Sequence, residues 1–169
     1  MVLSHRERHE SLRDIGFRTD NLSSAARLII IPTLAVVAIL LAIAWLLSQS
    51  EFRVRPLRVR LLLAPAWALF QQYALQGFIN RRAQIVFGPG LLSMSMVAIL
   101  FSIFHLPSPF LALLTLFGGF ALAGVYQRHP NLYALAFAHF AVSLTLSLSA
   151  PASLTQQLRV GFKYFGLEI

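Results

Sequence analysis

The chain has 169 residues, of which 57% are hydrophobic and only 12% charged, and its mean hydropathy is +0.71. A soluble domain carries about 25% charged residues, so this composition excludes an ordinary soluble protein and predicts one that lies almost wholly in a membrane. Cysteine is absent, which excludes a disulfide framework, a thiol nucleophile and a thiolate metal site. The net charge of +8 is explained by arginines that flank membrane spans beside anionic headgroups, so we expect no nucleic-acid partner.

The chain begins with a polar segment, residues 1–25, in which basic and acidic side chains are interspersed. This composition is typical of a solvated segment or a short surface helix. Arg27 then borders the apolar run 28–47, which has about the length that spans a bilayer. Because its polar leader is long and its apolar core exceeds that of a signal peptide, we expect an uncleaved membrane anchor.

Four further apolar runs follow, separated by breaks rich in Arg, Pro and Gly. These runs are residues 61–80, 91–106, 110–126 and 132–148. We expect Arg81 and Arg82 to end the first of them at a layer of lipid headgroups. The prediction is therefore an all-α fold, a polytopic membrane helix bundle of about five transmembrane helices within residues 26–149, with no soluble domain.

Two segments are expected to lie at the membrane surface beside this bundle. Residues 51–60 alternate basic and apolar side chains, and Pro56 argues against a helix through their middle. We therefore expect an interfacial loop there, with its arginines on lipid phosphates. The tail, residues 150–169, combines aromatic and basic side chains in a composition suited to the membrane interface.

Polar side chains interrupt the apolar runs at five positions. They are Gln71, Gln72, Gln76, His105 and His139. Lipid offers them no hydrogen-bond partner, so they must find partners inside the protein. Gln72 and Gln76 are four apart and share one helix face, and Gln71 lies about 100° round from Gln72. We expect all five residues to converge on one buried polar site, which contains no carboxylate because no acidic residue occurs between positions 52 and 167.

Three short motifs follow one another in the same runs. They are Gln71-Gln72-x-x-x-Gln76-Gly77, Phe101-x-x-x-His105 and His139-x-x-x-Ser143. From about residue 61 to residue 149, their order resembles the CPBP family, the CAAX-protease and bacteriocin-processing membrane proteins that are also called Abi. The motifs of that family are Glu-Glu-x-x-x-Arg, Phe-x-x-x-His and His-x-x-x-Asn. Glutamine therefore stands here in place of both glutamates and of the arginine, and serine in place of the asparagine.

The resemblance implies an intramembrane endopeptidase that cleaves prenylated or other membrane-bound substrates near their C-termini. In such a site the first glutamate and the first histidine activate water, while the second histidine and the asparagine stabilise the oxyanion. The candidate catalytic residues carried over from the family are Gln71, Gln72, Gln76, His105, His139 and Ser143. The implied partners are membrane lipids and a membrane-anchored peptide or protein, and the implied location is integral to the membrane, as in a plasma (inner) membrane.

The chemistry of glutamine conflicts with that reaction. A general base must accept a proton near neutral pH, and an amide does not. Catalytic zinc takes three protein ligands, of which His105 and His139 supply two, so we expect no metal and no cofactor. Three interpretations stay open: a peptidase with a modified site, a non-catalytic relative that binds a membrane peptide or lipid, and a structural partner subunit whose histidines only join helices.

Overall fold

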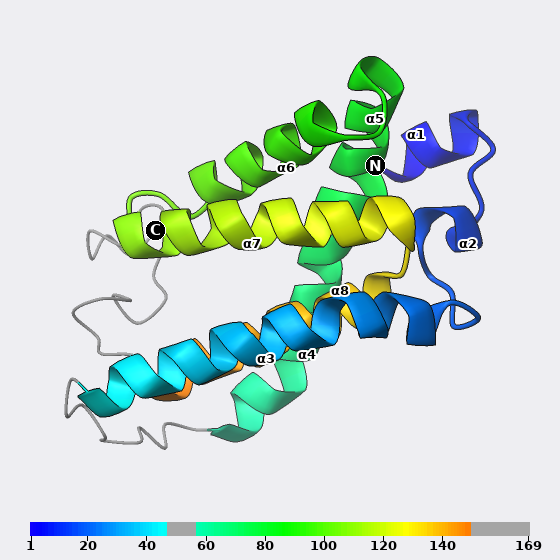
Figure 1. Cartoon of the computed structure of the whole chain (residues 1–169). Coiled ribbons are helices and arrows are strands. Elements are labelled where there is room, and N and C mark those ends of the chain that lie inside the picture. The colour runs from blue at the N-terminus through cyan, green and yellow to red at the C-terminus, as the bar shows by residue number, and fades with distance from the viewer. Residues whose placement is uncertain (47–56, 150–169) are drawn as a thin grey trace, which may run out of the picture.

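The computed structural model describes residues 1–46 and 57–149, and this part of the chain consists of helices and short connections without strands (Figure 1). In chain order the helices are α1 (Val2–Glu7), α2 (Leu12–Ile15), α3 (Leu22–Leu46), α4 (Leu57–Gln72), the π-helix η1 (Tyr73–Asn80), α5 (Arg81–Phe87), α6 (Leu91–Ile103), α7 (Pro109–Arg128) and α8 (Leu132–Ser149). The tail 150–169 lies outside the described residues. Of the expected loop 51–60, the part up to residue 56 lies outside them too, and the remainder is the first turn of α4 rather than loop.

Apolar helices make up the body of the protein. α6 packs along α7 and α3 packs along α8, while α4, η1 and α5 run on as one helix across both pairs (Figure 1). Within residues 1–46 and 57–149, three helices are long and apolar enough to cross a membrane by themselves: α3, α7 and α8. With the shorter apolar helix α6 and the continuous α4–η1–α5, they confirm the predicted all-α membrane helix bundle.

The helix that contains the second apolar run, residues 61–80, extends beyond the end of that run. Arg81 and Arg82 were expected to stop the helix, but it continues through them to Phe87. The backbone at Asn80 and Arg81 keeps right-handed helical angles, so η1 passes into α5 without a break. The helix ends only at Gly88, whose φ of +75° is a conformation that favours glycine.

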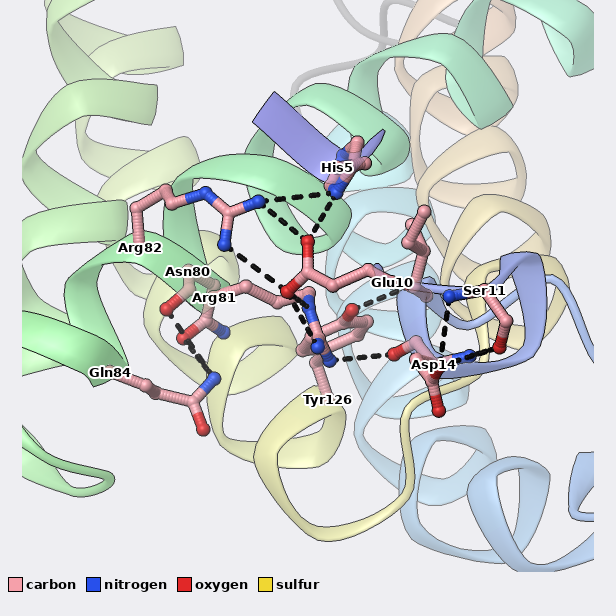
Figure 2. A network of polar contacts seen from close by, with 10 residues as sticks. His5, Glu10, Ser11, Asp14, Asn80, Arg81, Arg82, Gln84 and Tyr126 are labelled. Atoms are coloured by element: carbon pink, nitrogen blue, oxygen red, sulfur yellow. Dashed lines mark hydrogen bonds and ion pairs between the residues drawn. The ribbon is translucent and has the colours of Figure 1, made fainter. Parts of the chain in front are cut away.

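Both arginines form ion pairs with Glu10 of the N-terminal segment (Figure 2). Oε1 of Glu10 accepts hydrogen bonds from Arg81 Nη2 at 2.7 Å and Arg81 Nε at 2.9 Å. Oε2 accepts from Arg82 Nη2 at 2.6 Å and lies 2.6 Å from His5 Nδ1. Burial acts to raise the pKa of Glu10, but the hydrogen bonds from Arg82, His5 and Arg81 outweigh it and hold the pKa at about 2.

Further contacts fasten the same segment to the bundle. The Tyr126 hydroxyl donates to the backbone oxygen of Ile15 at 2.6 Å, and the Ile15 side chain is buried against η1. A Cβ on Gly77 of η1 would lie only 2.8 Å from Ile15 Cγ2, so glycine permits this close approach. His5 is also buried, at 4% exposure. Of the two expectations for this segment, the short surface helix therefore describes α1 and α2 better than the solvated segment, and both helices are docked on the bundle.

Candidate functional site

The bundle contains a cavity of about 740 Å³, lined mostly by hydrocarbon side chains of α3, α4, η1, α7, α8 and the end of α6. Four of the six residues singled out from the sequence line it: Gln71, His105, His139 and Ser143. Gln72 is fully buried and contacts His139, whereas Gln76 is absent from the lining. The cavity is therefore a mostly apolar chamber whose lining includes both histidines, and its further polar residues are Thr33, Thr115 and Ser147.

Aromatic side chains form the rim of this cavity. Each of them lines the cavity and is at least half exposed: Trp67, Phe70, Phe104 and Phe117. Trp67 and Phe70 stack on each other, with ring centroids 5.5 Å apart. Large apolar side chains exposed on a membrane helix face hydrocarbon rather than water, so the rim is continuous with the lipid-facing surface.

His139 receives a hydrogen bond from a glutamine. The Nε2 amide of Gln72 lies 3.0 Å from His139 Nδ1. An amide N–H can only donate, so Nδ1 is the acceptor and the proton of the neutral imidazole is on Nε2. His139 therefore has an N–H group to offer to a carbonyl oxygen or an oxyanion.

His105 has the opposite arrangement. Its Nδ1 lies 2.8 Å from the backbone oxygen of Phe101. A carbonyl only accepts, so Nδ1 carries the proton and Nε2 is the acceptor. The two histidines thus supply the site with one donor and one acceptor, and neither requires a charge.

The ring of Phe101 lies between the two imidazoles. Its centroid is 4.8 Å from that of His105 and 5.5 Å from that of His139, edge-on in both cases. Gly119 of α7 makes room for it, because a Cβ there would lie 3.1 Å from Phe101 Cδ1 and 3.2 Å from the Ala98 Cα. Phe101, the first residue of its motif, therefore fixes the spacing of the two histidines.

Gln76 belongs to a separate polar network, contrary to the expectation that all five residues meet at one site. Its Oε1 accepts a hydrogen bond from Asn80 Nδ2 at 2.8 Å, and Asn80 Nδ2 also donates to the Ala123 backbone oxygen at 3.3 Å. Asn80 Oδ1 accepts from Gln127 Nε2 at 3.0 Å and from Gln84 Nε2 at 3.1 Å. Gln76 and Asn80 are both fully buried.

The sequence contained a signal for this network that was not used. Gln72, Gln76, Asn80 and Gln84 follow one another at intervals of four residues, which places them in a row along one helix face. Gln127 is a further amide directly after the apolar run 110–126, in the last turn of α7. Five amides so placed predict a shared network, because each needs a partner inside the bundle.

No carboxylate lies beside the two histidines in the described lining of the cavity. Its described lining contains no Asp or Glu, and Glu10 is engaged by the two arginines where η1 meets α5. Nor does the part of the chain that the structure describes add a third His, Cys, Asp or Glu to His105 and His139 as a metal ligand. What this arrangement offers is hydrogen bonding: a donor at His139, an acceptor at His105, and the amide of Gln71 and hydroxyl of Ser143 beside them.

Comparison with known proteins identifies one family. The family model described as type II CAAX prenyl endopeptidase, Rce1-like, matches residues 56–145. The match covers more than half of the chain and includes all six candidate residues. No curated protein and no solved structure matches the chain.

Proposed function

The chain belongs to the Rce1-like family of type II CAAX prenyl endopeptidases, and from this membership we propose that its cavity binds the lipid-modified C-terminal segment of a membrane-anchored protein. The lipid chain occupies the apolar part of the cavity, and the peptide lies against His105, His139 and Ser143. Cleavage at this site is slow or does not occur.

One observation carries this proposal: His105 and His139, with Gln71 and Ser143, line a mostly hydrocarbon chamber of about 740 Å³. Clefts of roughly 300–1,000 Å³ with a few convergent polar groups are usual for ligand sites. A ligand that fits such a chamber is long and apolar, with hydrogen-bonding groups at one end. A prenylated peptide has this form.

The low turnover that we expect follows from the glutamines of the first motif, Gln71-Gln72-x-x-x-Gln76. General acid–base assistance is worth about 10²–10⁴-fold in rate, and the amide of Gln71 cannot supply it. An N–H donor aimed at a developing oxyanion is worth about 10²–10³-fold, and His139 retains one. The proposed site therefore recognises a peptide carbonyl well but activates water poorly.

The test is a prenylated, fluorescent peptide incorporated into liposomes with the purified protein. We expect photocrosslinking of the peptide to the wild type without appreciable cleavage, and cleavage after Gln71→Glu, which supplies a carboxylate and leaves the hydrogen bond from Gln72 to His139 in place. His105→Ala is expected to weaken crosslinking, and His129→Ala, which alters a histidine outside the cavity lining, to leave it unchanged. Fast cleavage by the wild type that is lost in His105→Ala would contradict slow turnover, and absence of crosslinking would contradict peptide binding.

A further inference from the structure

A row of amides runs along one face of the continuous helix, beginning beside His139. Its members on that helix are Gln72, Gln76 and Asn80, each fully buried, and Gln127 of α7 extends the row. An amide has a donor end and an acceptor end, so hydrogen bonds at one position restrict the orientation at the next.

Backbone groups fix the direction at the far end of the row. The Gly90 N–H donates to Gln127 Oε1 at 2.8 Å, which leaves Gln127 Nε2 to donate to Asn80 Oδ1 at 3.0 Å and to Ser93 Oγ at 2.9 Å. Asn80 Nδ2 must then donate to Gln76 Oε1 and to the Ala123 carbonyl. The Gly90 N–H can only donate and the Ala123 carbonyl can only accept, so the amides of Gln127, Asn80 and Gln76 each have one fixed orientation.

The row ends in two complementary free atoms. With Oε1 of Gln76 bound to Asn80, Nε2 of Gln76 is a donor, and one turn away Oε1 of Gln72 is an acceptor. Both atoms are buried, and among residues 1–46 and 57–149 neither has a hydrogen-bond partner. A buried polar group without a partner is strongly unfavourable, and a single water satisfies a donor and an acceptor together.

We propose that one buried water accepts from Gln76 Nε2 and donates to Gln72 Oε1, and that the amide row thereby holds His139 as an N–H donor toward the cavity. The water fixes Gln72 with its own N–H toward His139 Nδ1, and this bond places the imidazole proton on Nε2. Gln76, Asn80 and Gln127 are positioning residues that act on His139 through Gln72. The consequence for peptide recognition rests on the proposed function, but the tautomer of His139 does not.

This arrangement gives the glutamines of the first motif a role that glutamates would not have. A carboxylate at position 72 accepts hydrogen bonds only, so it would draw the imidazole proton to Nδ1 and leave Nε2 as an acceptor. The Gln72 amide instead donates to Nδ1 of His139, so the imidazole proton lies on Nε2. The row therefore suits a site in which His139 binds a carbonyl oxygen without becoming charged.

The test is ¹⁵N NMR of histidine-labelled protein in bilayers at mildly alkaline pH, where the shifts of the two ring nitrogens report the tautomer. His139 is assigned from the signal lost in His139→Asn. We expect the wild type to show only the Nε2–H form. Gln76→Leu removes the amide next to Gln72 in the row and should give a mixture of both forms, with roughly a fivefold loss of preference, as for one net hydrogen bond.

Gln84→Leu is the matched control, since Gln84 donates to the same Asn80 oxygen but lies outside the path from Gly90 to His139. It should leave the signal of His139 unchanged. If Gln76→Leu does not fold, Gln127→Leu interrupts the row at its far end and is expected to produce the same mixture. A wild type in the Nδ1–H form, or a folded Gln76→Leu or Gln127→Leu with His139 unaltered, would overturn the proposal. Failure of the protein to bind peptide would not change these spectra, so the two proposals fail independently.

Discussion

At the scale of single residues, neighbouring groups give His105 and His139 opposite hydrogen-bonding roles. The Phe101 carbonyl makes His105 an acceptor at Nε2, and the Gln72 amide makes His139 a donor at the same atom. Charge is unnecessary for either role. This matters in a membrane, where a buried charge is far more expensive than a neutral hydrogen bond.

Peptide binding should depend on the donor at His139. His139→Ala removes the N–H and should weaken the binding of a prenylated peptide about fivefold, as for one net hydrogen bond. The measurement is a titration of the labelled peptide against protein in nanodiscs, with His129→Ala as the control. Equal affinity of the wild type and His139→Ala would show that the peptide carbonyl does not contact this histidine.

At the scale of elements, the π-helix η1 connects the N-terminal segment to the interior. One of its faces carries Gly77 against Ile15, and another carries Gln76 and Asn80 toward α6 and α7. π-helical turns are wider than α-helical ones and occur frequently at functional sites. Here the widened turn lies between the histidine site and the ion cluster of Glu10.

Gly77→Ala should destabilise the protein by about 1–3 kcal/mol, because the added methyl would lie 2.8 Å from Ile15 Cγ2 in a packed contact. Gly118→Ala is the control. It is also a helical glycine, but a Cβ there meets nothing within 4 Å, so the higher helix propensity of alanine should make it neutral or stabilising. Thermal unfolding in detergent measures both, and equal effects would contradict the docking of α2 on η1.

The ion cluster should contribute measurably to stability. Glu10→Gln leaves Arg81 and Arg82 without their counter-ion and should lower the free energy of unfolding by about 2–3 kcal/mol. Asp20→Asn is the matched control, because Asp20 also pairs with two arginines, Arg13 and Arg18, but at the surface, where its side chain is 44% exposed. Asp20→Asn should lower the free energy of unfolding by less than about 1 kcal/mol. A similar loss in both variants would mean that the Glu10 cluster is no stronger than a surface pair.

The same carboxylate predicts how stability depends on pH. The pKa of Glu10 is lowered from its ordinary value of 4.5 to about 2 in the folded protein, because hydrogen bonds from Arg82, His5 and Arg81 overcome the effect of burial. As the pH falls, the unfolded chain binds the proton first, so acidification favours unfolding. The stability gap between wild type and Glu10→Gln should be full above pH 4.5 and disappear toward pH 2. Unfolding of both proteins across that range checks this, and a gap independent of pH would contradict it.

The sequence predicted some of these elements and not others, for identifiable reasons. Periodicity and hydropathy locate α6, α7 and α8 to within a few residues, and the motif order brings His105, His139 and Ser143 to one cavity. The four-residue spacing of the amides indicates the row to which Gln76 belongs, but not that Gln76 faces Asn80 rather than the cavity, because that depends on how the π-helix turns its faces toward α7. The Glu10–Arg81 pair joins residues 71 positions apart, and no local pattern records such a contact.

At the scale of the whole molecule, the cavity depends on parts of the chain outside residues 56–145, to which the family likeness applies. α3 lies wholly outside that range, yet it supplies one wall of the cavity with Ile29, Pro32, Thr33 and Val36. α3 packs on α8, which carries His139 and Ser143. α3 is therefore part of the cavity wall, besides being long and apolar enough to cross a membrane.

This role of α3 leads to a prediction for ligand uptake. Thr33→Trp places a large ring in the cavity and should reduce the binding of a prenylated peptide at least tenfold, since the ring and the lipid chain would compete for the same hydrocarbon space. Leu34→Trp is the matched control on the next residue, because Leu34 is 60% exposed and does not line the cavity. Titration of the fluorescent peptide against each variant in nanodiscs measures the effect, and thermal unfolding verifies that both variants fold. Undiminished binding by a folded Thr33→Trp would place the lipid chain outside the cavity and leave α3 with an anchoring role alone.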